Sequence, residues 1–246
     1  MDELTGKTAL VTGAARRIGH AISVGLAKQG VSIIAHYNTS EEEAKKLKSE
    51  LTDLGVDAWL FRADFTKPDS HRILIESAYK VSGKIDILVN NASIFYADRH
   101  DVGLDDININ MMVNAWTPFV LGNYFSEKVA RGKIINLLDT RISGYDFNHF
   151  AYYLSKRMLE ILTRSMALKL APRFNVNGIA PGLILPPEGK DYSYLEQRKD
   201  TVPLRRSGSV SDVVEAAVFL LRNDFITGEV IHVDGGKHLI QTIEGI

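Results

Sequence analysis

Residues 8–20 read TALVTGAARRIGH, a short apolar run followed by a glycine turn and the start of a helical pattern. The apolar run is typical of a strand buried on both faces. Gly13 permits a tight turn, and Gly19 permits close approach of the backbone or close helix packing. The N-terminus of the following helix offers free N–H groups and a positive dipole end to a pyrophosphate. A glycine pair alone is weak evidence for nucleotide binding, so the prediction depends on what the rest of the chain forms.

The rest of the chain repeats this alternation of strand and helix. Strand-like runs follow at residues 31–36, 57–63, 85–89, 133–138, 175–180 and 229–233. Helical patterns separate them; Ser40 is expected to cap one helix and Pro68 to open the next. Strands separated by helices form right-handed βαβ units and a parallel sheet. We therefore predict an α/β fold, in which residues 1–246 form a single Rossmann-type domain: a doubly wound parallel sheet of seven strands with helices on both faces.

Composition excludes several classes of function. The chain has 246 residues, 45% of them hydrophobic, and a formal net charge of -1, which excludes a simple basic binder of nucleic acid or membranes. It has no cysteine, and its seven histidines lack metal-ligand spacing, so we expect no metal site. Neither a signal peptide nor an apolar run of about 18 residues is present, and a cytoplasmic location is the default expectation.

The end of the second strand bears on the choice of cofactor. Residues 36–40 read HYNTS, with no acid before Glu41. An acid at this place normally binds the ribose 2′-OH of NAD, whereas hydroxyls, an amide and the guanidinium of Arg17 suit a 2′-phosphate. We therefore predict NADP(H) rather than NAD.

A tyrosine and a lysine lie four residues apart, at Tyr152 and Lys156. On a helix they share one face, and a nearby ammonium is expected to lower the phenol pKa. Tyr152 then becomes a proton donor near neutral pH. On its own this pair is a common surface motif, and the glycine turn and the strand order are what favour a catalytic role.

Together these motifs resemble the short-chain dehydrogenase/reductase family over essentially the whole chain. The further matching segments are Asp64, residues 90–92 (NNA), Asn114, residues 181–182 (PG) and residues 234–236 (DGG). The resemblance implies that Asn114 holds a water in a proton relay, that Lys156 binds the nicotinamide ribose, and that the protein is a homotetramer. The residues that it and the strand ends assign to the cofactor are Gly13, Arg17, Ile18, Gly19, His36, Tyr37, Asn38, Thr39, Ser40, Asp64, Phe65, Asn91, Ala92, Ser93, Tyr152, Lys156, Pro181 and Gly182.

The chain departs from the family pattern at two positions. His20 stands where a third glycine is usual, and Asp139 stands where a serine usually donates a hydrogen bond to a substrate carbonyl. An ionised carboxylate only accepts hydrogen bonds, so it would repel a ketone that gains negative charge and attract a protonated C=N bond or an N–H edge. A protonated Asp139, or the neighbouring Thr140, could still replace the serine.

Asp-for-Ser replacement is a mark of the pteridine reductase and dihydromonapterin reductase-like branch of the family. Residues 90–96 (NNASIFY) and the turn at 14–20 also resemble that branch, which implies that Phe95 stacks on a pterin and that Arg17 and Ser93 bind its polar edges. Residues 183–208 resist assignment and are expected to form a substrate loop or lid.

The leading hypothesis is thus an NADPH-dependent reductase that transfers a hydride to a C=N bond of a dihydropterin-like substrate. Its catalytic residues would be Asp139, Tyr152, Lys156 and Asn114, and its substrate-binding residues Arg17, Ser93, Phe95, Asp139 and Tyr152. A 3-oxoacyl-carrier-protein reductase or another carbonyl reductase is the alternative. A non-catalytic NADP-binding regulator is a third possibility, against which the intact Asn114, Tyr152 and Lys156 argue.

Overall fold

The computed structural model describes residues 3–67, 69–95, 102–240 and 243–244. Within these residues, seven strands form one parallel sheet, in the order β3-β2-β1-β4-β5-β7-β8. The predicted doubly wound seven-stranded sheet is confirmed. The strands are β1 (Thr8–Val11), β2 (Ser32–Tyr37), β3 (Ala58–Arg62), β4 (Ile87–Asn90), β5 (Gly132–Leu137), β7 (Phe174–Pro181) and β8 (Val230–Val233).

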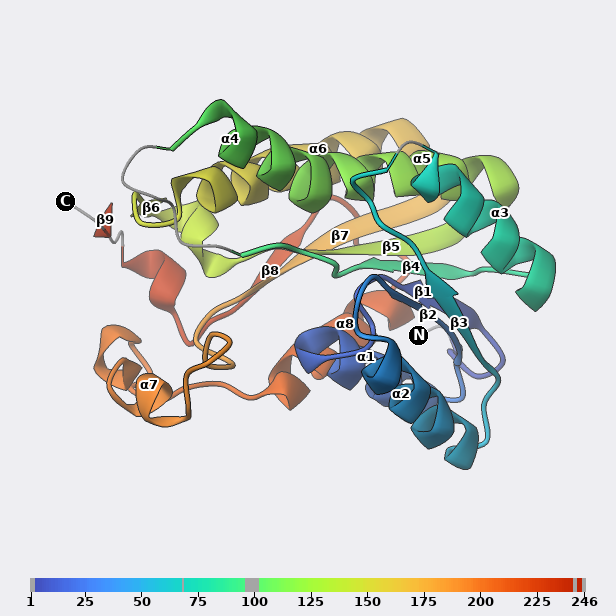
Figure 1. The fold of residues 1–246 in the computed structure, drawn as a ribbon, viewed down its shortest axis with the longest axis horizontal. Helices are drawn as coiled ribbons and strands as arrows, with labels where there is room; N and C mark the ends of the chain where they lie inside the picture. Colours follow the sequence, from blue (N-terminus) through green and yellow to red (C-terminus); the bar gives the residue numbers. More distant parts are fainter. Residues whose placement is uncertain (1–2, 68, 96–101, 241–242, 245–246) are drawn as a thin grey trace.

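Helices cover both faces of this sheet, as predicted (Figure 1). One layer consists of α1 (Arg17–Ala27), α2 (Glu41–Asp53) and α8 (Val210–Arg222). The other consists of α3 (Ser70–Ser82), α4 (Leu104–Met111), α5 (Thr117–Lys128) and α6 (Phe150–Leu170). Because each strand is covered twice, its side chains alternate between two cores: Ala9 and Val11 of β1 join the core under α1 and α8, while Leu10 joins the core under α3 and α5.

Several local features were not predicted. A π-helical turn (Met112–Trp116) joins α4 to α5. A second sheet pairs β6 (Tyr145–Asp146) in parallel with β9 (Ile243–Glu244) near the C-terminus. Residues 183–208 contain only α7 (Ser193–Glu196) and a short 3-10 turn (Lys199–Thr201), and two more such turns occur at Thr140–Ser143 and Lys237–Leu239.

Ser40 precedes α2 as predicted, but its side chain makes no capping hydrogen bond, so the expected capping chemistry is wrong. The predictions for Pro68 and Tyr96 fall outside the described residues. Within the described ranges, no helix is both long and apolar enough to cross a membrane.

Candidate active site

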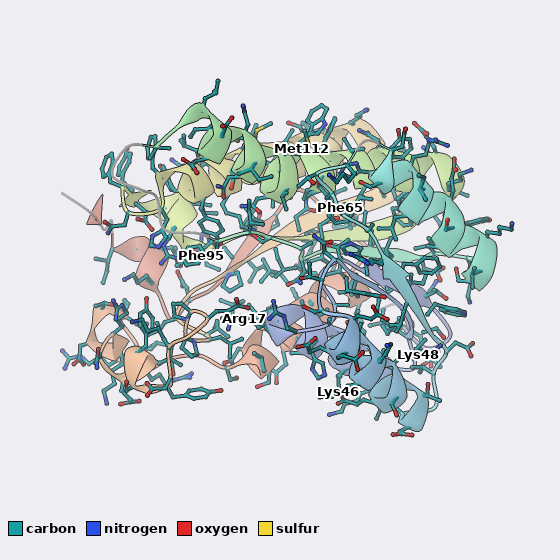
Figure 2. The ribbon with its side chains drawn as sticks, viewed as in Figure 1. Arg17, Lys46, Lys48, Phe65, Phe95 and Met112 are labelled. Atoms are coloured by element: carbon teal, nitrogen blue, oxygen red, sulfur yellow. The ribbon has the colours of Figure 1, made fainter. Side chains whose placement is uncertain are left out.

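The predicted site residues gather where parallel strands end, beside the point where the strand order reverses between β1 and β4. Gly13 follows β1, Asn91 follows β4, Asp139 follows β5, and Pro181 ends β7. Figure 2 shows Phe95, on the segment after β4, and Arg17, at the start of α1, on this side of the molecule, whereas Lys46 and Lys48 lie on α2.

The glycine turn is packed too closely for larger side chains. Gly13 has a positive φ of 62°, and a Cβ on it would lie 3.0 Å from the Ala92 Cα. A Cβ on Gly19 would lie 2.2 Å from the Gly13 carbonyl oxygen. The Asn91 amide donates to the Thr12 and Gly13 carbonyls at 2.9 and 3.0 Å. This closely packed turn, the glycine cradle, lies at the N-terminus of α1, where the first backbone N–H groups of a helix have no partner within the helix and can bind an anion.

The His36 side chain supports this turn through contacts of both of its ring nitrogens. Its Nδ1 accepts from the Gly13 N–H at 3.1 Å, and its Nε2 lies 3.1 Å from the Ala63 carbonyl. These partners require a neutral ring with the proton on Nε2. Burial, above all, lowers the pKa of His36 to about 4. The ring stacks on buried Phe65, which also stacks on His71, so both predicted cofactor residues support the binding surface through buried side chains.

The rim beyond β2 is polar and carries no acid. Asn38 and Thr39 are exposed, and Tyr37 and Ser40 are half-buried. The Arg62 guanidinium, which was not predicted, donates from Nε to the Asn38 carbonyl at 3.1 Å. Nearby, Asp64 accepts from the N–H and hydroxyl of Thr66, and these bonds hold its pKa below the ordinary value. This surface suits a ribose that carries a phosphate better than a carboxylate-lined rim would.

Arg17 and Arg16 contact the candidate lid. Arg17, with a positive φ of 56°, donates from Nη2 to the Pro186 carbonyl at 2.7 Å. Arg16 pairs with Glu188 at 3.2 Å. Ile18 lies at the same helix start and packs against the core. The expected contacts of Arg17 with a phosphate and a pterin remain predictions, since its guanidinium here binds the loop.

Asn114 is buried in the π-helical turn and ties three elements together. Its Oδ1 accepts from the Ile94 N–H at 2.8 Å and from the Ser93 hydroxyl at 3.0 Å. Its Nδ2 lies 3.0 Å from both the Ile94 carbonyl and the Ser155 hydroxyl. Ser155 in turn donates to the Tyr152 carbonyl at 2.6 Å. Asn114 thus fixes the segment that carries Ser93 and Phe95 against α6; Ser155 was not predicted.

Asp139 and Tyr152 are in direct contact. The Tyr152 hydroxyl donates to Asp139 Oδ2 at 3.0 Å, and the same carboxylate accepts from the Arg141 N–H at 2.8 Å and from Arg141 Nη1 at 3.2 Å. The other predicted pair is also close: Lys156 Nζ lies 5.6 Å from the Tyr152 ring centroid and donates to the Leu137 carbonyl at 2.8 Å.

The electrostatics at Tyr152 differ from the sequence expectation. Its pKa is raised well above the ordinary value, first by burial and then by the Asp139 carboxylate, while Arg141 acts in the opposite direction. The pKa of Lys156 falls to about 8, because burial disfavours the ammonium more than Asp139 favours it. The expected lowering of the phenol pKa by Lys156 is therefore wrong in this structure, because desolvation and a carboxylate outweigh it.

Phe95 is 37% exposed and sits among polar aromatic neighbours. His149 stacks on its ring with centroids 4.5 Å apart, and Tyr152 meets it edge-on at 4.7 Å. The Arg141 guanidinium lies 5.3 Å from the ring centroid. His149, to which the sequence analysis assigned no role, therefore lies beside the candidate site residues.

The far wall of the site is formed by the end of β7 and the turn after β8. A Cβ on Gly182 would lie 2.6 Å from the Asp234 Cβ. Asp234 accepts the Thr140 hydroxyl at 2.5 Å and the His238 N–H at 2.7 Å. The Thr140 hydroxyl proton is therefore directed to Asp234.

Comparisons with known proteins agree with this geometry. A family model described as enoyl-(acyl carrier protein) reductase matches residues 13–238. Pteridine reductase 1 of Leishmania tarentolae is 32% identical, over 96% of this chain and 97% of its own. A polyketide synthase putative ketoacyl reductase of Streptomyces violaceoruber is 30% identical, over 97% and 99%. The crystal structure of FolM alternative dihydrofolate reductase 1 from Brucella canis, complexed with NADP, superposes with a TM-score of 0.92 at 33% identity, covering 98% of this chain and 97% of that one.

Proposed function

The chain belongs to the short-chain dehydrogenase/reductase family of oxidoreductases, and from this premise we propose that it is an NADPH-dependent pterin reductase that reduces a C=N bond of a dihydropterin-like substrate. The observation that carries the proposal is Asp139, whose carboxylate accepts hydrogen bonds from Tyr152 and Arg141 at the place where a carbonyl reductase needs a donor.

The residues present fit a dinucleotide with a 2′-phosphate. The glycine cradle, in which a Cβ on Gly13 or Gly19 would meet backbone, brings the turn close to the N-terminus of α1, where a pyrophosphate would bind. Asn38, Thr39 and Ser40 would face the ribose, with Arg62 beside them. When bound, NADPH supplies the hydride from C4 of its nicotinamide ring.

The protein's own groups would handle the proton. Hydride addition to the carbon of a C=N bond leaves the nitrogen strongly basic, and the Tyr152 hydroxyl would give it a proton. The Tyr152 phenol, whose pKa lies above the ordinary value, is protonated at neutral pH and therefore has a proton to give in the direction of reduction, although the raised pKa makes it a weaker acid. Lys156, with a pKa of about 8, is placed to return a proton to the site.

Asp139 would recognise the substrate. Its described contacts are all hydrogen-bond donors, which identifies it as an acceptor, and an acceptor suits the amino and ring N–H groups of a pterin. Phe95 would provide a flat apolar surface, of which His149 covers part. Ser93, held by Asn114, would bind a polar edge of the ring.

The carbonyl reductase alternative is favoured by the similarity to a ketoacyl reductase, but the site lacks its donor. The hydroxyl of Thr140, the obvious substitute for the missing serine, already donates its hydrogen bond to Asp234, at 2.5 Å. A ketone would then receive a hydrogen bond from Tyr152 alone and would face a carboxylate as its oxygen became negative, which opposes reduction.

The test is loss of NADPH absorbance with a dihydropterin and with an acetoacetyl thioester, offered separately to the same enzyme preparation. We expect turnover with dihydrobiopterin, dihydromonapterin or dihydrofolate and little with the thioester. Asp139→Ser should lower pterin turnover and raise thioester turnover. Turnover by the unaltered enzyme of the thioester alone would overturn the proposal.

We also propose that the protein is a homotetramer in the cytoplasm. Several large apolar side chains are exposed to solvent on the helical layer that contains α4 and α6, among them Leu104, Ile161 and Leu168. Such exposed apolar surface commonly marks subunit contacts. Residues 183–208, held by Arg16 and Arg17, remain our candidate for the lid of the substrate site.

A further inference from the structure

Arg141 lies at the centre of an ion-pair network that the pterin hypothesis did not include. Its Nη1 lies 3.2 Å from Asp139 Oδ2, and its Nε lies 2.7 Å from Asp146 Oδ2. The guanidinium also lies over the Phe95 ring, 5.3 Å from the centroid. One side chain thus contacts the acceptor carboxylate, a second carboxylate and the expected stacking surface. Arginine suits this role because its planar fork has donors on several edges.

Asp146 is the fixed end of the network. Its side chain is 1% exposed, and it accepts from the Asn148 N–H at 3.0 Å and from the His149 N–H at 3.1 Å. Burial alone would raise the pKa of Asp146, but hydrogen bonds from His149 and the charge of Arg141 lower it below the ordinary value. The backbone of Asp146 pairs with β9, which secures the loop from a second side. A buried carboxylate held in this way makes a rigid anchor for a guanidinium.

The free end of the network is Asp139, whose side chain is 16% exposed. Oδ1 accepts from the Arg141 N–H, and Oδ2 accepts from Arg141 Nη1 and Tyr152. An ionised carboxylate has about four acceptor positions, and three are used by the described residues. One position on Oδ1 remains for a substrate N–H. Without the Arg141 side chain, the carboxylate would keep only the Arg141 backbone N–H and the Tyr152 hydroxyl as described partners, and its orientation toward the substrate would be less well defined.

We propose that Arg141 is a positioning residue: anchored on Asp146, it holds Asp139 as an oriented acceptor against Tyr152 and against the N–H edge of the substrate. The proposal rests on the proposed function for its substrate. It makes Asp146, which is itself buried, the anchor through which Arg141 acts. Arg141 acts only through Asp139, so its effect must disappear when Asp139 no longer carries a charge.

A double-mutant cycle tests this directly. We expect Arg141→Ala and Asp139→Asn each to lower kcat/KM for the dihydropterin about 100-fold, and the double variant to lose about the same rather than about 10,000-fold. The Kd for NADPH, measured by nucleotide fluorescence, should change less than about twofold in all three. Multiplicative losses, or a large change in the NADPH Kd, would show that Arg141 is merely structural and would overturn the proposal.

Arg141→Lys keeps the test informative if Arg141→Ala folds poorly, and chemical rescue gives a second test if it folds. Arg141→Lys keeps the charge but cannot bridge both carboxylates, so it should recover only part of the activity. Ethylguanidinium at millimolar concentration should raise the activity of Arg141→Ala at constant ionic strength, but should leave Arg141→Ala/Asp139→Asn unchanged. Arg157→Ala is the matched control, because Arg157 lies on the exposed side of α6 and pairs with Glu160 at 3.6 Å. Equal rescue of the single and double variants would contradict the proposal.

The cycle also separates this proposal from the proposed function. It measures coupling between two residues, so it can be run with whichever substrate the unaltered enzyme reduces. Coupling with a thioester and no turnover of any pterin would overturn the proposed function and leave the role of Arg141 standing. Turnover of a pterin without coupling would do the reverse.

Discussion

The turns after β1 and after β5 both end a buried strand at the same edge of the sheet, but they present different kinds of functional atom. In the β1 turn, the side chains of His36 and Asn91 bind the Gly13 backbone, and the candidate anion-binding atoms are backbone N–H groups at the start of α1. In the β5 turn, the side chains of Asp139 and Arg141 bind one another and face the site directly. The first turn functions because its glycines have no Cβ, so that the backbone can pack closely. The second functions because the charges of Asp139 and Arg141 are paired.

This difference predicts that substitutions in the two turns will impair different properties of the enzyme. A Cβ or an altered brace in the β1 turn distorts backbone and should weaken nucleotide binding. A lost charge or hydroxyl in the β5 region leaves the cradle intact and should lower turnover while nucleotide still binds. The opposite pattern in the following experiments would contradict this contrast between the two turns.

Tyr152→Phe should cause the largest loss, a fall of about 10³-fold or more in kcat, because it removes the proton donor at the reacting nitrogen. The NADPH Kd should stay within about twofold, since Phe keeps the buried ring that Phe95 meets edge-on. Single-turnover reduction of a dihydropterin and nucleotide fluorescence would measure the two quantities. Tyr153→Phe is the matched control, because Tyr153 is the next residue and is also buried. A tenfold loss or less in Tyr152→Phe would mean that another group supplies the proton.

Gly19→Ala should act on the cofactor side instead. The new Cβ would lie 2.2 Å from the Gly13 carbonyl oxygen, so the backbone of the turn must move. We expect the NADPH Kd to rise about 100-fold, since the N–H groups that face the phosphates move with the turn, and the melting temperature to fall by several degrees. Calorimetry with NADPH and thermal unfolding would measure both.

The control for that experiment is Gly103→Ala. Gly103 likewise lies at a helix N-terminus, but among the described residues a Cβ on it would meet only the flexible Asp106 side chain, at 3.5 Å. Its NADPH Kd should be unchanged. If Gly19→Ala lowered kcat and left the Kd unchanged, the assignment of the glycine turn to the nucleotide would be wrong.

The same contrast explains which parts of the molecule could be predicted from sequence. The sheet and the glycine turn follow from local patterns: apolar runs buried on both faces, and glycines where a Cβ would meet backbone. The spacing of Tyr152 and Lys156 follows from helix geometry. Asp139 could be found because a carboxylate at that place opposes the expected chemistry.

The ion-pair network that Asp139 joins through Arg141 could not be predicted in that way. Arg141, Asp146 and His149 lie in an irregular stretch with no period, so nothing in the sequence says which carboxylate the arginine would join. The direction of the Tyr152 pKa was missed for a related reason. The charge of Lys156 could be read from the sequence, but the burial of the phenol and its contact with Asp139 depend on the fold.

His36 offers the smallest expected effect, and it concerns stability rather than turnover. Its pKa is about 4 in the folded protein and about 6.5 when exposed, so the unfolded chain binds more protons between these values. Stability from the neutral ring is complete above about pH 6.5 and is lost as the pH falls toward 4, with a loss of about 2 kcal/mol by pH 5. Urea unfolding at several pH values should show a smaller loss in His36→Gln, which lacks this titrating ring, than in the unaltered protein; His71 and His232, whose pKa values burial also lowers, account for the remainder. His20→Gln should keep it, because His20 is half-exposed and pairs with Glu50 at 2.9 Å. An identical pH dependence in unaltered protein and His36→Gln would mean that the Gly13 turn does not depend on a neutral imidazole, and that backbone packing alone holds the cradle.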